Sequence, residues 1–220
     1  MKFQDLSIAI ILDVETTGRA PRRDRIVEVK LLKYDFNRDV MLETYFQRFN
    51  PHIPIEFMAH QVNGLDNLAL KDAPDFGDQA HLIKQFIGNF PIIGHRVAFD
   101  MAFFEAEFDR LEIRGIGLNP WLCTMENIPS EIQTVWPNHL SLQESVIRGR
   151  VDAGCFELPP QFIHAAKICG LALYFKGVEG AAPPSGKQER RLLSWRDIME
   201  RPFVFWVAVI MLFFIMLANV

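Results

Sequence analysis

The stretch that most constrains the fold is an apolar run that ends in two acidic residues, LSIAIILDVETTG at residues 6–18. Its continuous Ile, Leu, Ala and Val side chains are typical of a central strand that is buried on both faces. Asp13 and Glu15 lie at the end of this run. Because side chains alternate across a strand, we expect the two carboxylates to point to the same side and to converge beyond the strand end.

Two carboxylates at one point repel each other unless a cation lies between them. Hard divalent ions such as Mg²⁺ and Mn²⁺ prefer oxygen ligands, and two such ions about 3.5–4 Å apart assist displacement reactions at phosphorus. We therefore interpret Asp13 and Glu15 as metal ligands. An isolated acidic pair also occurs at solvated strand ends, so this interpretation depends on the rest of the chain.

The rest of the first 176 residues combines strands with helices. Residues 25–36 and 40–49 are rich in Val, Leu, Tyr and Phe, and the Asn-Arg-Asp sequence between them predicts a hairpin turn. Residues 91–96 predict a further short buried strand. Helical spacing is found in three segments, residues 75–90, 99–113 and 159–175. Strands that come first and helices that are interleaved later predict a mixed α/β sheet.

Composition changes sharply after residue 176. Residues 177–189 gather Gly, Pro and small polar residues, which indicates a linker that extends through a basic segment to residue 201. Residues 203–218 carry no charged or strongly polar side chain. The last 18 residues would span roughly 27 Å as a helix, close to the ~30 Å hydrocarbon core of a bilayer. A buried core helix is usually apolar on one stripe only, so we predict a transmembrane helix at residues 202–220.

The residues just before this apolar segment indicate how it is oriented in the membrane. Arginines precede the apolar run at positions 190, 191, 196 and 201. Because positively charged flanks stay on the cytoplasmic side, the pattern predicts a single-pass, C-terminally anchored protein with its N-terminal domain in the cytoplasm. Asp13 and Glu15 interrupt the N-terminal apolar run, so no signal peptide is expected.

The net charge narrows the possible functions. A formal charge of −4 lacks the basic excess that would by itself indicate nucleic-acid binding through phosphate neutralisation. Any function on nucleic acids must therefore depend on a local site. The three cysteines, at positions 123, 155 and 169, form no CxxC motif, which is typical of a chain in a reducing compartment.

Three motifs together resemble the DEDDh class of 3′-to-5′ exonucleases, which includes the proofreading subunit of bacterial DNA polymerase III and ribonuclease T. They are LDVETTG at 12–18, AHQVNGL at 59–65 and GHRVAFD at 94–100, and the resemblance spans residues 6–176. It implies a ribonuclease H-like mixed sheet flanked by helices. It also implies Asp13, Glu15 and Asp100 as ligands of two Mg²⁺ or Mn²⁺ ions. By the same resemblance, the pocket for the terminal nucleotide is lined by Thr16, Thr17 and Gly18.

The third motif of the class is a His followed five residues later by an Asp. His164 is similar to that histidine, and the resemblance implies that it acts as the general base, with Glu15 as a further catalytic residue. A side chain that titrates near neutral pH suits this task. Cys169 stands where the class has its fourth carboxylate, and a soft thiol does not replace an Asp toward Mg²⁺. His164 also fits an ordinary half-buried helix histidine.

Two functions remain open at this point. The first is a membrane-tethered exonuclease that removes nucleotides from a single-stranded 3′ end of DNA or RNA by two-metal hydrolysis. The second is a non-catalytic module of the same fold that binds a nucleic-acid end or a protein, because the acidic set is incomplete. We expect the first, since Asp13, Glu15, Asp100 and His164 are all retained.

Overall fold

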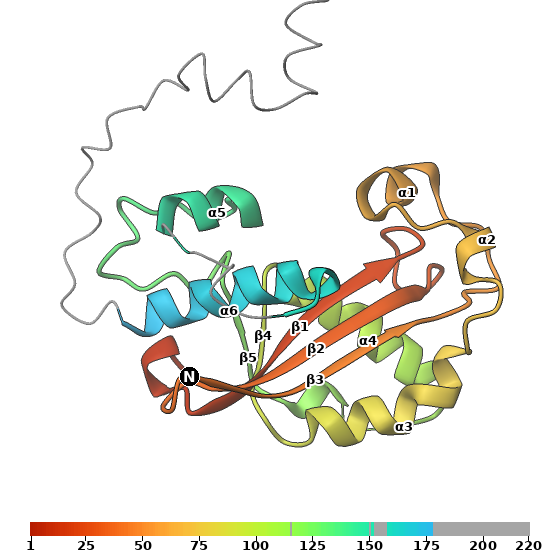
Figure 1. Cartoon of the computed structure of the whole chain (residues 1–220), viewed down its shortest axis with the longest axis horizontal. Helices are drawn as coiled ribbons and strands as arrows, with labels where there is room; N and C mark the ends of the chain where they lie inside the picture. Colours follow the sequence, from red (N-terminus) through yellow and green to blue (C-terminus); the bar gives the residue numbers. More distant parts are fainter. Residues whose placement is uncertain (115, 150, 152–157, 178–220) are drawn as a thin grey trace, which may run out of the picture. The chain divides into compact units, whose positions relative to one another are not determined.

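The computed structural model describes residues 1–114, 116–149, 151 and 158–177. In this part of the chain, five strands form one sheet in the order β3-β2-β1-β4-β5 (Figure 1). The strands are β1 (Ile8–Thr16), β2 (Ile26–Asp35), β3 (Val40–Arg48), β4 (Ile92–Gly94) and β5 (Trp121–Cys123). Strand β2 pairs antiparallel with both β1 and β3, whereas β4 pairs parallel with both β1 and β5. The predicted mixed sheet is confirmed.

Strand β1 lies in the middle of the sheet, as its apolar run predicted. Ile10, Ile11 and Leu12 are fully buried, and their side chains alternate between two hydrophobic clusters. The predicted hairpin is formed by β2 and β3. Its turn is held by Asp35, whose Oδ1 accepts hydrogen bonds from the backbone N–H groups of Asn37 and Arg38 at 3.0 Å each.

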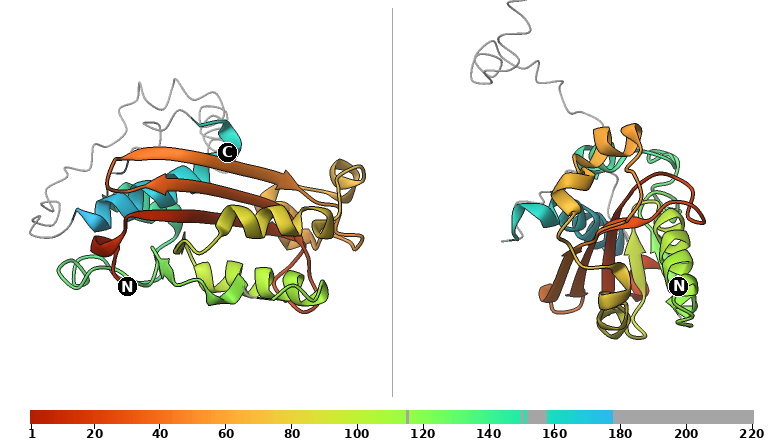
Figure 2. Two further views of the ribbon diagram at one scale, coloured as in Figure 1. Left: turned by 90° about the horizontal axis from the view of Figure 1, so that it is seen from below. Right: turned by 90° about the vertical axis from the view of Figure 1, so that its right-hand side faces the viewer.

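Helices cover both faces of the sheet (Figures 1 and 2). On one face lie α3 (Phe76–Ile87) and α4 (Val97–Arg110), whose apolar side chains share a cluster with Ile10 and Leu12 of β1. On the other face lies α6 (Ile163–Lys176), which packs against Ile11 together with a residue of α5 (Leu142–Gly149). Asp13 and Glu15, two and four residues after Ile11, therefore lie on the α6 face of β1.

Short elements complete the described fold. Helices α1 (Phe57–Asn63) and α2 (Asn67–Leu70) lie beyond the C-terminal end of β1 (Figure 1). Gly64 ends α1 with a φ of 69°, a left-handed conformation that glycine adopts without strain. The 3₁₀-helices are η1 (Phe3–Asp5), η2 (Ile116–Leu118) and η4 (Pro160–Phe162).

The predicted C-terminal segments fall outside this description. Helix α6 ends at Lys176, where the predicted exonuclease-like domain ends, and residues 178–220 are not among the described residues. The linker at 177–201 and the transmembrane helix at 202–220 therefore stay predictions. Among the residues that the structure describes, none of the helices is long and apolar enough to cross a membrane.

Candidate active site

The carboxylates predicted as metal ligands line one cavity of about 300 Å³ at the C-terminal end of β1. Asp13 and Glu15 reach it from β1, and Asp100 reaches it from the first turn of α4. His164, in the first turn of α6, lines the same cavity. Residues 150 positions apart in the sequence thus meet at the strand end because α4 and α6 cover opposite faces of the sheet and both begin near it.

The acidic pair and the histidine form a tight group. One possible ligand atom from each of Asp13, Glu15 and His164 lies within 4.8 Å of the others. The His164 Nδ1 atom lies 3.8 Å from Asp13 Oδ2, and the imidazole is 48% exposed. The sequence-based expectation that the two carboxylates converge is therefore met in the structure. The exposed ring edge leaves room for a water molecule or a substrate beside the group.

Asp100 is placed differently from the sequence-based expectation. Helix α4 begins at Val97 rather than at residue 99, and its N-cap is Arg96, whose φ of 76° is left-handed. Asp100 is therefore the fourth residue of the helix and is only 8% exposed. Burial raises the pKa of Asp100 well above its ordinary value, and the charges of Asp13 and Glu15 add to the shift. This carboxyl group therefore needs a cation nearby in order to ionise.

In the Thr-Thr-Gly turn after β1, two residues line the cavity and the third is buried in the interior. Thr16 and Gly18 line the cavity, and the Thr16 hydroxyl donates to the Gly18 carbonyl at 2.6 Å. Thr17 is fully buried and is not among the residues that line this cavity. Its Oγ1 instead accepts a hydrogen bond from the Arg25 N–H at 3.0 Å. Thr17 therefore shapes the turn from behind rather than facing the cavity.

Gly18 is required by close packing. A Cβ atom at this position would lie 2.3 Å from Asp24 Oδ2 and 2.8 Å from the carboxyl carbon of Glu56. Asp24 is held in place because its Oδ2 accepts a hydrogen bond from the Ala20 N–H at 2.7 Å. The turn therefore has no space for a larger residue, and a backbone without a side chain faces the cavity.

Lys30 is the site residue that the sequence-based prediction missed. Its Nζ atom lies 2.9 Å from Asp13 Oδ2 and 3.4 Å from Glu15 Oε1, and the side chain is 6% exposed. Lys30 lies directly opposite Asp13 in the antiparallel β1–β2 pair, so both side chains project from the same face. Glu28 and Lys30 interrupt the apolar sequence of β2, but this pattern does not show which residue of β1 lies opposite Lys30.

A row of alternating charges extends from the cavity across three strands. Lys30 Nζ lies 2.8 Å from Glu28 Oε1, and Arg48 of β3 places its Nε 2.6 Å from Glu28 Oε2. Glu28 is buried and has a cationic partner on each oxygen. The charges of Glu28 and Arg48 thus compensate each other. The positive charge of Lys30 is then available to compensate the negative charges of Asp13 and Glu15.

The protonation of the cluster follows from this arrangement. Burial raises the pKa of Glu15 to about 7, and the neighbouring Asp13 carboxylate adds to the shift. Burial alone would lower the pKa of Lys30, but its carboxylate neighbours, Asp13 foremost, outweigh burial and raise it above its ordinary value. Lys30 therefore stays cationic at neutral pH, and Glu15 is poised between its neutral and ionised forms.

Cys169 does not join the group. It is fully buried in the hydrophobic cluster between α6 and the sheet, together with Ala165 and Ile168. The ligand-atom group of Asp13, Glu15 and His164 does not include it. Residues 165–177 contain no Asp or Glu, so the only candidate ligand that α6 brings to the cavity is the imidazole of His164. Asp13, Glu15 and Asp100 line one cavity and offer the oxygen atoms that a hard divalent cation prefers, although Asp100 is outside the group of ligand atoms within 4.8 Å. The fourth carboxylate that the class uses is not supplied by α6.

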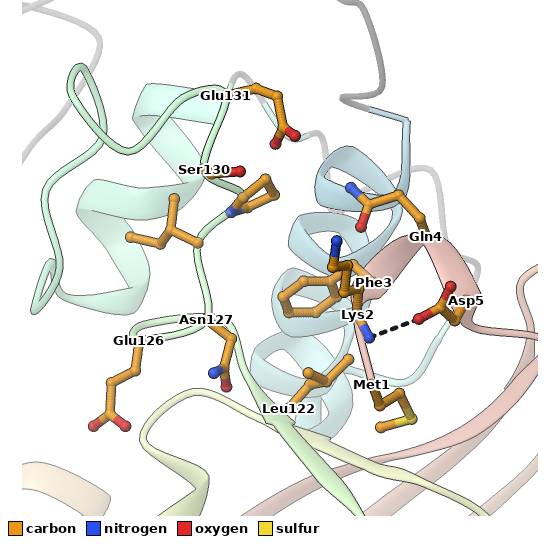
Figure 3. A pocket seen from close by; sticks show the side chains of 12 residues that line it. Met1, Lys2, Phe3, Gln4, Asp5, Leu122, Glu126, Asn127, Ser130 and Glu131 are labelled. Atoms are coloured by element: carbon orange, nitrogen blue, oxygen red, sulfur yellow. Dashed lines mark hydrogen bonds between the residues drawn. The ribbon is translucent and has the colours of Figure 1, made fainter.

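A second cavity, of about 440 Å³, lies beside the N-terminal 3₁₀-helix η1 (Figure 3). The Lys2 backbone N–H donates to Asp5 Oδ2 there at 2.9 Å. Glu126 and Glu131 also line this cavity, but their carboxylates lie on different sides of it and do not converge (Figure 3). We therefore place the candidate active site in the cavity at the end of β1.

Comparison with known proteins now identifies the family. The family model described as Exonuclease matches residues 10–142, which include Asp13, Glu15 and Asp100. The chain belongs to the exonuclease family. The sequence-based resemblance to DEDDh-class 3′-to-5′ exonucleases is confirmed. His164 and Cys169 lie beyond the matched residues.

Individual relatives within the exonuclease family are large polymerases. The chain is 28% identical over 117 residues to the PolC-type DNA polymerase III of Bacillus subtilis strain 168. The matched region covers 53% of this chain and 8% of that protein. It is 32% identical over 118 residues to the PolC-type DNA polymerase III of Latilactobacillus sakei subsp. sakei strain 23K, with the same coverage of 53% and 8%. The chain thus spans less than a tenth of the length of these relatives.

Solved structures agree on the exonuclease fold. Exonuclease X in complex with 5′ overhanging duplex DNA matches with a TM-score of 0.56 at 18% identity, over 80% of this chain and 95% of that chain. Product-bound exonuclease I matches with a TM-score of 0.60 at 16% identity, over 78% of this chain and 44% of that chain. These likenesses confirm the ribonuclease H-like arrangement of a mixed sheet flanked by helices.

Proposed function

We propose that the chain is a 3′-to-5′ exonuclease that hydrolyses phosphodiester bonds at the 3′ end of a nucleic-acid strand. One observation carries this proposal. Ligand atoms of Asp13, Glu15 and His164 lie within 4.8 Å of one another, in a cavity that Asp100 also lines. The family match supports the same reaction, because it covers all three carboxylates.

We propose His164 as the general base. Its imidazole is half exposed at the cavity, so it can accept a proton from a water molecule that approaches from solvent. Asp13 Oδ2, 3.8 Å from Nδ1, would stabilise the imidazolium that forms. The proton then has an exposed route back to bulk water.

The carboxylates suit Mg²⁺ or Mn²⁺, because both ions prefer oxygen ligands. We propose that Asp13, Glu15 and Asp100 hold the ion. A bound divalent cation supplies positive charge that stabilises the negative charge developing on the phosphate during hydrolysis. Ionisation of Glu15 and Asp100 then accompanies metal binding, because burial holds the pKa of each carboxyl group above its ordinary value.

The walls of the cavity suit a strand end of any sequence. Met58 and Val62 of α1 and Phe99 of α4 line it, and the two α1 residues are exposed. An unpaired base can pack against such apolar side chains without selection for its identity. We propose a single-stranded 3′ end of DNA or RNA as the substrate. Solved relatives of this fold, among them exonuclease I in complex with a dT13 oligonucleotide, support the proposal.

Hydrolysis of a labelled strand tests this function. We expect the full-length chain to release labelled mononucleotide from a 3′-labelled single strand in Mg²⁺ or Mn²⁺ and to stop when EDTA removes the metal. Asp13→Asn, which removes one ligand charge, should lower the rate by at least about 10²-fold. The matched control is Asp72→Asn, because Asp72 is exposed at a distance from the cavity. Equal rates for Asp13→Asn and the unmodified chain would refute the site assignment.

A second candidate function is a non-catalytic module that binds a nucleic-acid end or a protein. Two observations favour it. Cys169 is buried in the core where the class has its fourth acid, and Lys30 places an ammonium group against Asp13 and Glu15. The same experiment separates the two functions. Binding of the labelled strand without metal-dependent cleavage by the unmodified chain would favour the module.

We also propose that the C-terminal segment anchors the domain to a membrane, with the domain on the cytoplasmic side. The apolar run at 203–218 and the arginines before it support this proposal. We expect the full-length chain to sediment with membranes and to resist extraction by high salt, because apolar burial does not depend on ionic strength. A chain that ends at Gly180 should remain in the supernatant. Full-length protein found entirely in the supernatant without detergent would contradict the anchor.

A further inference from the structure

The Lys30 ammonium group lies where a cation is needed between the site carboxylates. It is within 3.4 Å of Asp13 and Glu15, and it is 2.8 Å from Glu28. A lysine ammonium has three N–H donors, so three carboxylate oxygens use all of them. With the side chain 6% exposed, little water competes for these contacts. Lys30 is therefore a built-in cation of the site rather than a mobile surface charge.

Strand register holds this ammonium in place. Asp13 lies opposite Lys30 and Glu15 lies opposite Glu28 in the β1–β2 pair, so the four side chains project from the same face. Arg48 lies opposite Glu28 in the next pair and binds its second oxygen at 2.6 Å. Glu28 cannot turn toward the cavity without breaking this contact. The position of the Lys30 Nζ atom is thus determined by three strands.

We propose that Lys30 takes the place of the second divalent cation, so that the active site binds a single divalent ion. The inference rests on the proposed function, because it concerns the same carboxylates. It goes beyond that function because it assigns a role to a residue outside the family motifs quoted above. Asp13 Oδ2 already contacts Lys30, so an ion on this oxygen would lie next to a fixed positive charge.

Charge balance supports a single ion. Asp13, Glu15 and Asp100 bring three negative charges when ionised, while Glu28 and Arg48 compensate each other. One ammonium group and one divalent ion neutralise these three charges completely. A second divalent ion would leave the site with a net positive charge and without the carboxylate that Cys169 replaces. Asp13, Glu15 and Asp100 all line the cavity, so the single ion would share these carboxylates with the Lys30 ammonium group.

The number of bound ions tests the proposal without any measurement of cleavage. Full-length chain, kept in mild detergent, is titrated with Mn²⁺ alone, and free Mn²⁺ is followed by electron paramagnetic resonance. We expect one bound Mn²⁺ per unmodified chain and two per Lys30→Ala chain, because removal of the ammonium leaves Asp13 Oδ2 and Glu15 without their cationic partner. Any number other than one for the unmodified chain, or the same number for both chains, would overturn the proposal.

Two further variants keep the test sharp. Lys30→Gln removes the charge while its amide retains a donor toward Asp13, so it replaces Lys30→Ala if circular dichroism shows that the Ala variant is unfolded. Lys33→Ala is the matched control, because Lys33 lies on the same strand but pairs with Glu43 at 2.8 Å, outside the cavity lining. We expect one Mn²⁺ in the control. A second Mn²⁺ in Lys33→Ala would show that loss of any β2 lysine has the effect and would overturn the proposal.

Failure of this inference is distinguishable from failure of the proposed function. A chain that binds one Mn²⁺, gains a second in Lys30→Ala and cleaves nothing would contradict the exonuclease activity and leave the role of Lys30 in place. A chain that cleaves with two bound Mn²⁺ would do the reverse. The two measurements therefore give independent answers about the same site.

Discussion

His164→Ala should lower the rate of nucleic-acid hydrolysis by about 10²–10⁴-fold, the usual contribution of a general base. We propose the imidazole as the proton acceptor because its Nδ1 lies 3.8 Å from Asp13 Oδ2. Its half-exposed position means that its removal breaks few packing contacts. We expect the unfolding temperature and the affinity for a single strand to stay nearly unchanged while the rate falls. Steady-state release of mononucleotides measures the rate.

The control for this variant is His81→Ala, because His81 is exposed on α3 and is not part of the cavity lining. It should retain the full rate. If His164→Ala also retains the full rate, another group activates the water, and His164 is an ordinary helix histidine. A loss of strand binding that parallels the loss of rate would likewise contradict its assignment as a base.

Glu107→Ala should lower the free energy of unfolding by about 1–3 kcal/mol, because it leaves the buried Ile26 N–H and the partly exposed Arg25 guanidinium without their acceptor. Glu107 is 1% exposed and accepts hydrogen bonds from the Arg25 side chain at 2.8 and 3.0 Å. It also accepts the Ile26 N–H at 3.1 Å. These contacts join α4, which carries Asp100, to the segment that enters β2. Urea-induced unfolding of the two chains measures the difference.

Glu105→Ala is the matched control for this variant, since Glu105 lies on the same helix and is exposed. A surface substitution of this kind should change the free energy of unfolding by no more than about 0.5 kcal/mol. If both variants lower the free energy of unfolding by a similar amount, the loss comes from the change in helix α4 itself and not from the Arg25–Glu107 contact. A loss below about 1 kcal/mol in Glu107→Ala would contradict the argument directly.

The convergence of Asp13 and Glu15 could be predicted because it depends only on local geometry. Any extended strand points residues i and i+2 to one side, and the apolar run showed where the strand ends. The hairpin of β2 and β3 was predictable for a similar reason, since its turn is closed by short-range hydrogen bonds to Asp35. The positions of Asp100 and His164 relative to the strand came from the family resemblance, because contacts between distant segments leave no periodic signal.

Lys30 could not be predicted because its place depends on strand register. The pattern of β2 showed which residues alternate, but not which of them lies opposite Asp13, and a slip of one residue would turn Lys30 to the other face. Thr17 was expected in the pocket as part of its motif, but its buried hydroxyl accepts the Arg25 N–H instead. Strand β5 has only three residues, too few to show an alternating pattern.

The central claim, hydrolysis from a 3′ end, is tested most directly by a comparison of linear and circular single strands. The full-length chain is incubated in Mg²⁺ or Mn²⁺ with a 5′-labelled linear strand and with a closed circle of the same sequence. We predict a ladder of labelled products that shorten from the 3′ end of the linear strand and an intact circle, because we propose that the cavity at Asp13 binds a strand end. A linear strand that stays intact, or a circle that is cut, would contradict the account.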